Sequence, residues 1–522
     1  MTQLDPCSVK CQHRPVKADA SEENKKTGRG LLAIIGAKIW FILTGFAIKF
    51  SLPHFLGSPA EFGFYETAMS AVSMLNMVLI ASTIQTVSKF VSESEEDAPA
   101  LLRQGLFVQC IVGGLIALGA FAAAPLLAGF LKDDALVPLL RVATVVIIAY
   151  ALYAAIVGSL NGRRAFVAQA RLDATFSLLR TVGIIGGAAL GLGAIGAISG
   201  FACAASAILL IAFIAVRSDL RSKTGTRIPW KKWFAFMAPI WVYQLALNGC
   251  FQIDGLVLKR AVAGLAIDNG ATAVEAAQLA SRQVGFYRAA QTFAFVPYQL
   301  ILALTFVVFP LVSKATTLGD EKAARSAVRG AMRFSFLVLL ALAAPIAGAA
   351  QGALRIAYPA EYVVPGAPAL TILALAMVAF ALFVITATIL SGMGRPGLAA
   401  GIAGVSLVVI ILAGTYMVRR AGTGPEALPA LATATATGTT LAFLLSAGVL
   451  YGRFGVLIPL ATLVRGALAA CAAGAVAHAL PQDSRLLGLA ALVAGGLTYL
   501  AVLAVTRELT KADVELVTKL RR

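Results

Sequence analysis

Several charged side chains lie inside long apolar stretches of this sequence, where burying an ionisable group costs free energy. Lys38, Lys49, Arg180 and Arg465 are the cations, and Asp254 is the carboxylate. In a membrane helix such a group costs roughly 2.5 to 3.5 kcal/mol, so it needs a partner, water or an escape to the interface. Long cationic side chains can snorkel to the interface, whereas Asp254 is too short to do so. Lys38 and Arg180 lie deepest among the cations, so we predict that they face a polar cavity.

Polar residues also form stripes at helical spacing. Gln244, Asn248, Gln252 and Lys259 recur at intervals of four, four and seven, which at about 100° per residue keeps them on one helix face. The same arithmetic aligns Lys38 with Lys49. Interhelical hydrogen bonds would explain such stripes as well as a wet interior would. The residues predicted to line a substrate cavity are Lys38, Lys49, Arg180, Gln244, Asn248, Gln252, Asp254 and Lys259.

A six-residue pattern occurs twice, as GFYETA at 63–68 and GFYRAA at 285–290. Each copy opens an apolar stretch that ends in VSK. Aligning the copies sets Glu66 opposite Arg288, an anion against a cation. We predict that these two residues form an extracytoplasmic gate, paired when the cavity opens inward and parted when it opens outward. The alternative is that each faces headgroups or water.

The elements that must position these residues are membrane helices. Of the 522 residues, 59% are hydrophobic and 13% are charged, and the mean hydropathy is +0.86. Soluble domains cannot bury that much apolar surface. About fourteen stretches reach the roughly twenty residues needed to cross a bilayer. They are 31–52, 64–87, 105–128, 139–160, 172–191, 195–216, 238–260, 286–311, 334–356, 368–391, 398–418, 428–450, 457–479 and 486–506. The predicted fold is an all-α polytopic membrane protein.

The orientation follows from the basic residues, since Lys and Arg concentrate in cytoplasmic loops. With the N-terminus inside, the cytoplasmic segments hold most of the 43 Lys and Arg residues. We therefore expect both termini in the cytoplasm of a bacterium, with the chain in its inner membrane. The formal net charge of +18 is explained by basic loops against anionic headgroups, so no nucleic-acid partner is expected.

The repeats divide the chain. Six spans separate the two GFY copies, an even number, so both copies point the same way through the membrane, as in a parallel repeat. A weaker pair, SLNGRR at 159–164 and SGMGRP at 391–396, has the same separation. We predict a disordered tail at 1–30, a first six-helix lobe at 31–216, a second at 217–450, a helix pair at 451–506 and a tail at 507–522. The segment 261–285 has no counterpart in the first half and is predicted to form a short surface helix.

The sequence gives little evidence for metal binding or for catalysis. Cys7, Cys11 and His13 have loosely metal-like spacing but too few ligands, and no metal or cofactor is expected. The loops are too short for a catalytic domain with its own core. No catalytic residues are predicted.

The chain resembles the polysaccharide and oligosaccharide flippases of the multidrug/oligosaccharidyl-lipid/polysaccharide (MOP) exporter superfamily. The resemblance rests on LGSPAEFGFYETA, QTVSKFVSE, GSLNGRRAF and GFYRAAQTFAFVPYQLILALTFVVFPLVSKA, and it covers about residues 30–506. It implies two six-helix lobes, a terminal helix pair and a basic central cavity, matched here by Lys38, Arg180 and Arg288. It further implies movement of undecaprenyl-diphosphate-linked sugars to the outer leaflet. The segment before GFYRAA departs from the shortest members of the family.

The leading prediction is therefore an alternating-access transporter of a lipid-linked oligosaccharide for cell-surface polysaccharide biosynthesis. Its expected partners are that substrate, membrane lipids and glycan-assembly enzymes. A cationic interior suits a diphosphate in a low-dielectric cavity. One alternative is a cation-coupled multidrug antiporter of the same superfamily, which would rely on membrane carboxylates. A membrane glycosyltransferase or polymerase would want acidic residues in an outer loop, and 132–134 offers the only candidate.

Overall fold

The computed structural model describes residues 16–222, 224–299, 321–455 and 457–508, and every regular element in these ranges is a helix. The first set comprises α1 (Val16–Leu56), α2 (Pro59–Glu93), α3 (Ala98–Phe130), α4 (Leu136–Gly162), α5 (Phe166–Gly187), α6 (Gly193–Ala215) and the short α7 (Arg217–Arg221). The second set comprises α8 (Trp230–Asp268), α9 (Ala273–Ala294), α11 (Glu321–Gly348), α12 (Ala350–Ala357), α13 (Ala360–Gly392), α14 (Pro396–Ala421) and α15 (Ala427–Phe454). The last pair is α16 (Leu460–Ala479) and α17 (Arg485–Val505).

The described residues contain twelve helices long and apolar enough to cross a membrane. One of these is 166–215, which a turn with positive φ at Gly191 and Gly193 divides into α5 and α6. The two helices then fold back on each other, because Gly183 meets Gly200 and Gly187 meets Gly196 backbone to backbone. The predicted span 286–311 lies partly outside the described residues, so the count of fourteen stays a prediction.

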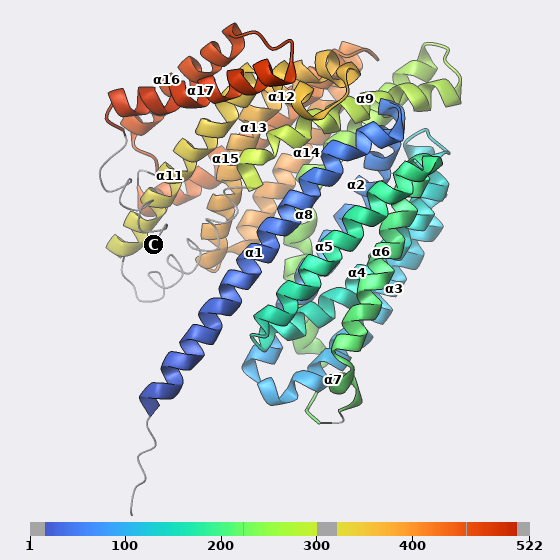
Figure 1. The fold of residues 1–522 in the computed structure, drawn as a ribbon, viewed down its shortest axis with the longest axis vertical. Coiled ribbons are helices and arrows are strands. Elements are labelled where there is room, and N and C mark those ends of the chain that lie inside the picture. The colour runs from blue at the N-terminus through green and yellow to red at the C-terminus, as the bar shows by residue number, and fades with distance from the viewer. Residues whose placement is uncertain (1–15, 223, 300–320, 456, 509–522) are drawn as a thin grey trace, which may run out of the picture.

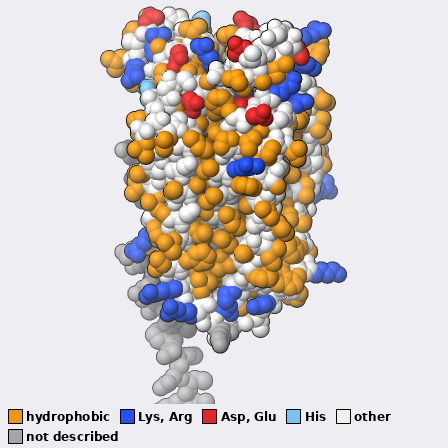
Figure 2. Space-filling model, turned by 90° about the vertical axis from the view of Figure 1, so that its right-hand side faces the viewer, with side chains coloured by type: hydrophobic (Ala, Val, Ile, Leu, Met, Phe, Trp, Pro, Cys, Tyr) orange, Lys and Arg blue, Asp and Glu red, His pale blue; other side chains and the backbone are white. Residues whose placement is uncertain are grey.

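The surface of the molecule matches a membrane environment. Figure 2 shows a broad band of hydrophobic side chains around the middle of the visible face, with charged side chains gathered at the two ends. Acidic side chains appear mainly at one end of this face, whereas the opposite end carries Lys and Arg. The chain is therefore a multi-pass membrane protein, and its orientation in the membrane stays a prediction.

The same helix pairings occur in both sets. In the first set α1 packs on α5, α2 and α3 on α4, and α6 on both α4 and α5. In the second set α8 packs on α14, α9 and α11 on α13, and α15 on both α13 and α14. Figure 1 shows the two sets side by side, with α16 and α17 on the outer side of α11 and α12. This correspondence supports the predicted duplication, and the division into lobes stays a proposal.

The weaker sequence echo also has matching geometry. After α4 the amide of Ala165 donates to Leu160 O, and after α13 the amide of Arg395 donates to Leu390 O. Both turns carry the left-handed residue that this type of helix end requires, Arg164 with φ 55° and Gly394 with φ 78°. The two sequences SLNGRR and SGMGRP therefore terminate equivalent helices in the same way.

Two helix boundaries differ from the expectations. α1 begins at Val16, within the segment expected to be a disordered tail, since residues 16–30 contain several Ala, Glu and Lys residues that favour helix. α8 continues to Asp268, and α9 begins at Ala273, so the segment 261–285 is not a separate surface helix. It forms the tip of a helical hairpin.

The C-terminal pair is held tightly against α11 and α12. Gly348 meets Gly474, and Gly352 meets Gly488, at distances that leave no room for a side chain. Glu508, just beyond α17, accepts hydrogen bonds from Arg333 and Arg465 at 3.0 Å each. Burial works to raise the pKa of Glu508, but the hydrogen bonds from Thr462, Arg333 and Arg465 outweigh it and hold the pKa below the ordinary value.

Candidate functional site

The first polar region lies between α1, α2 and α5. The Lys38 side chain is 59% exposed, and its Nζ lies 3.9 Å from an oxygen of Asp173 on α5. The Lys49 side chain is 37% exposed and forms an ion pair with the buried Glu66 on α2. The predicted face of the first span is thus turned toward α5 and α2, and its two cations retain exposed surface.

Arg180 completes this region from α5. Its guanidinium lies 4.2 Å from the centre of the Phe41 ring, in a cation–π contact. It also lies beside Gly45, where an added Cβ would be 3.7 Å from its Nη2. The buried Nε of Arg180 has no hydrogen-bond partner among the described residues. A buried donor without a partner is costly, and a ligand oxygen would satisfy it.

Sequence reasoning missed Asp173 and Tyr153, which belong to the same region. The Tyr153 hydroxyl donates to Asp173 at 3.2 Å. Asp173 lies near the start of the predicted span 172–191, where a carboxylate is expected in headgroups. Its spacing of seven residues from Arg180 on one helix is the signal that would have identified it.

The second polar region lies in α8 and α9 and is buried. Asp254 is fully buried, and one of its oxygens lies 3.3 Å from Nη1 of Arg288. Its other oxygen accepts from Gln291 Nε2 at 2.7 Å and from the Tyr287 hydroxyl at 3.1 Å. With the Gly255 amide at 2.7 Å, the carboxylate has four donors. Donors from the protein itself therefore compensate the charge of Asp254, which needs no ligand for this purpose.

The remaining predicted residues of α8 take different positions. Gln244, Asn248 and Gln252 are half-buried, and Asn248 Nδ2 donates to Gln244 O at 2.8 Å. Lys259 is fully buried and forms an ion pair with Asp133 after α3. The structure therefore places Lys38, Lys49 and Arg180 on two helices that pack together, α1 and α5, and places Lys259 elsewhere.

The predicted pair of Glu66 and Arg288 has other partners in this structure. Glu66 forms an ion pair with Lys49, and Arg288 forms one with Asp254, so each charge is paired within its own set of helices. Arg288 does cross to α2, where its Nη2 donates to Ser70 Oγ at 2.9 Å. The glycines of the two GFY copies lie at this crossing, since a Cβ on Gly63 would collide with Ser281 O and one on Gly285 with Pro59 O. The repeat thus places two glycines where α2 and α9 approach most closely, and the gating role of Glu66 and Arg288 stays a prediction.

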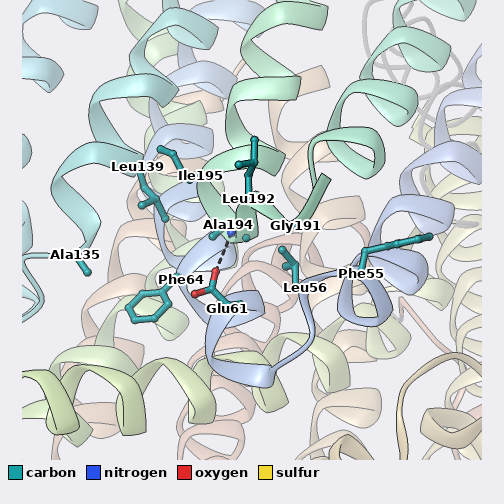
Figure 3. A pocket seen from close by; sticks show the side chains of 11 residues that line it. Phe55, Leu56, Glu61, Phe64, Ala135, Leu139, Gly191, Leu192, Ala194 and Ile195 are labelled. Carbon is teal, nitrogen blue, oxygen red and sulfur yellow. Dashed lines mark hydrogen bonds between the residues drawn. The ribbon is translucent and has the colours of Figure 1, made fainter. Parts of the chain in front are cut away.

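A cavity of about 520 Å³ lies at one end of the first set. Figure 3 shows it between the α1–α2 turn, the start of α4 and the α5–α6 turn. Most of the residues that line it have apolar side chains, and Glu61 points into it while accepting a hydrogen bond from the amide of Ala194 at 2.8 Å. None of the predicted cavity residues lines it, so this cavity is separate from the cationic region. No group of three or more metal-ligating side chains occurs in the described ranges.

Solved structures with the same fold are membrane transporters. A lipid II flippase, MurJ, in an inward closed conformation matches with a TM-score of 0.69 and 14% identity, over 91% of this chain and 98% of its own. A multidrug resistance MATE family transporter in an outward-facing conformation matches with a TM-score of 0.59 and 15% identity, over 81% and 96% of the two chains. A transporter from Pyrococcus furiosus Vc1 (DSM3638), described as having a binding pocket of reversed polarity, has a TM-score of 0.59 and 13% identity, over 83% and 96%. The fold is that of MOP superfamily transporters.

The family is shown by the sequence itself. A model of the polysaccharide biosynthesis protein family matches residues 29–316, which is more than half of the chain. The chain belongs to this family. No curated protein matches it.

Proposed function

We propose that the protein is an alternating-access flippase that carries an undecaprenyl-diphosphate-linked oligosaccharide across the bacterial inner membrane. The observation that carries this proposal is the set of exposed or unsatisfied cations on α1 and α5, namely Lys38, Lys49 and Arg180. A diphosphate entering a low-dielectric site needs such donors. Family membership and the transporter fold support the proposal. Both termini then lie in the cytoplasm, where glycan-assembly enzymes would supply the substrate.

The contrast between the charges of α1 and those of α8 favours an anionic ligand. Asp254, Lys259 and Arg288 form buried ion pairs within the protein, whereas Lys38 and Lys49 keep exposed surface, so the charge that α1 leaves for a ligand is positive. A cationic drug would need the opposite arrangement, a carboxylate with exposed surface.

A cation-coupled multidrug antiporter is the second candidate. The observation that favours it is Asp173, a carboxylate with 15% of its side chain exposed. Lys38 lies beside it and opposes the entry of a cation, which makes this candidate weaker.

The test is binding to purified protein in detergent. We expect an undecaprenyl-diphosphate-linked oligosaccharide to bind, and we expect Lys38→Gln with Arg180→Gln to weaken its affinity by tenfold or more, since each charged contact contributes about 1.5 to 3 kcal/mol. A lipophilic cation is the matched competitor. Binding of that cation without binding of the lipid would favour the antiporter.

A further inference from the structure

The tip of the α8–α9 hairpin lies over the turn that joins α3 to α4. This tip, residues 261–285, and the part of α8 just before it, which carries Lys259 and Arg260, belong to the second set of helices, whereas the turn belongs to the first. Arg260 donates to the Phe130 carbonyl oxygen and lies 3.8 Å from the centre of the Phe130 ring. An added Cβ on Gly264 would be 3.4 Å from Lys132 Nζ. The first half of the sequence has no segment that corresponds to this tip, so the repeat provides no second contact equivalent to this one.

The centre of this contact is an ion pair between Lys259 and Asp133, whose charged atoms lie 2.5 Å apart. Their side chains are 0% and 1% exposed. Lys259 also donates to the Ala277 carbonyl oxygen at 2.9 Å and to the Ser281 hydroxyl, and its Nζ lies 4.7 Å from the centre of the Phe64 ring. The ammonium group therefore has a full set of partners, of which Asp133 and Phe64 lie across the boundary between the two sets.

The backbone holds Asp133 in place for this contact. The amide of Asp133 donates to Ala128 O at 2.9 Å, in the same helix-ending turn that follows α4 and α13. Lys132 occupies the left-handed position with φ 57°, which is unfavourable for a residue with a Cβ. The Ala135 amide donates to Asp133 Oδ1 at 3.1 Å and fixes the carboxylate. The side chain is thus oriented before Lys259 reaches it.

The ion pair is continuous with the close helix crossing. Ser281, which accepts from Lys259, is also the residue whose carbonyl faces Gly63 on α2. The ion pair and the close crossing therefore both join the two sets at the end of the molecule opposite α7 in Figure 1. Separating the sets at this end breaks both.

We propose that the ion pair of Lys259 and Asp133 holds the extracytoplasmic side of the transporter closed, and we call this pair the latch. The α8–α9 hairpin carries Lys259, and the α3–α4 turn carries Asp133. This inference rests on the alternating-access part of the proposed function. In the closed state the two buried charges satisfy each other, and in the open state water solvates both. Removing one charge leaves the other buried and unpaired only in the closed state, so a single neutral substitution shifts the population toward the open state.

The experiment measures access to a reporter cysteine below the latch. Ser73→Cys serves this purpose in a chain whose six native cysteines are replaced by alanine, because Ser73 follows Glu66 and Ser70 along one face of α2. Intact cells are treated with a membrane-impermeant maleimide, and the rate of labelling is measured. We expect Asp133→Asn and Lys259→Gln each to raise this rate by about tenfold or more.

The matched control is Asp134→Asn, the same change at the exposed neighbouring residue, which should label at the parent rate. The double variant Asp133→Asn with Lys259→Gln leaves no unpaired charge, so it should label more slowly than either single variant. It also keeps the test decisive if a single variant fails to accumulate in the membrane.

Three results would overturn the latch. They are Asp133→Asn labelling at the rate of Asp134→Asn, the double variant labelling as fast as the single variants, and the parent already labelling as fast as an exposed cysteine. The assay uses no substrate. Failure to bind a lipid-linked sugar would therefore reject the proposed function and leave the labelling result intact.

Discussion

α1 and α8 occupy equivalent places in the two sets of helices, yet they use their charges in opposite ways. Lys38 and Lys49 on α1 keep 59% and 37% of their side-chain surface exposed. Asp254 and Lys259 on α8 are fully buried and paired. α1 thus presents cations with exposed surface, whereas Asp254 and Lys259 of α8 are compensated by other residues of the protein.

The role of a charge in a membrane helix depends on its burial and on its hydrogen-bond partners. A charge that is buried with several hydrogen bonds contributes to structure, and removing its partner is costly. A charge with exposed surface and few partners adds little to stability and is available to a ligand. Matched variants of the two helices therefore test whether their charges differ in this way.

The largest expected effect is on stability in α8. Asp254→Asn leaves the buried Arg288 without its anion and should lower the free energy of unfolding by about 3 to 5 kcal/mol. Lys38→Gln on α1 should change it by less than about 1 kcal/mol. Thermal unfolding of both purified variants in one detergent checks this. Equal losses would show that the two helices do not differ as described.

A second effect concerns the crossing of α2 and α9. Gly63→Ala places a Cβ against the backbone of Ser281, which cannot move aside, and should cost about 2 to 3 kcal/mol. Gly119→Ala is the control, because nothing lies within 4 Å of its added Cβ, and it should gain about 0.5 to 1 kcal/mol from helix propensity. Thermal unfolding again reports both. A neutral Gly63→Ala would mean that the crossing is looser than the structure shows.

A smaller effect depends on pH and concerns the C-terminal pair. The folded pKa of Glu508 lies below its ordinary value of 4.5, so its contribution is fully present above pH 4.5 and is lost as the pH falls through the folded pKa. The loss should appear as lower protection of the α16 and α17 amides against hydrogen exchange, relative to the intrinsic exchange rate at each pH. Glu508→Gln should remove this pH dependence. Unchanged protection in the parent over that range would argue against a role for Glu508 in docking the pair.

Much of the fold could be predicted from the sequence. The apolar runs predicted most helices, because a bilayer demands a fixed length of apolar chain. The repeats GFYETA and GFYRAA predicted where equivalent helices begin, and the structure adds that their glycines meet each other. The hairpin tip at 261–285 was predicted as a separate surface helix, since it lies outside the apolar runs and those runs do not show that α8 and α9 extend into it.

The site was less predictable for a physical reason. Periodicity shows that Lys38 and Lys49 share a face, and that Asp254 and Lys259 lie on one helix, but it does not show which helix packs against that face. Lys259 was grouped with the cavity because its partner, Asp133, lies in a distant turn. Asp173 was overlooked because a carboxylate near the start of a span is expected in the headgroups, although its spacing of seven residues from Arg180 places both on one helix face.

We propose that Lys38 and Lys49 on α1 and Arg180 on α5 receive an anionic lipid-linked sugar. The most direct test is translocation of a fluorescent undecaprenyl-diphosphate-linked oligosaccharide by protein reconstituted in liposomes. The double variant Lys38→Gln with Arg180→Gln is compared with Lys231→Gln and Lys232→Gln, which removes two exposed cations at the start of α8. The account predicts at least a tenfold loss of rate for the first pair and a rate near that of the parent for the second. Normal translocation by the first double variant would contradict it.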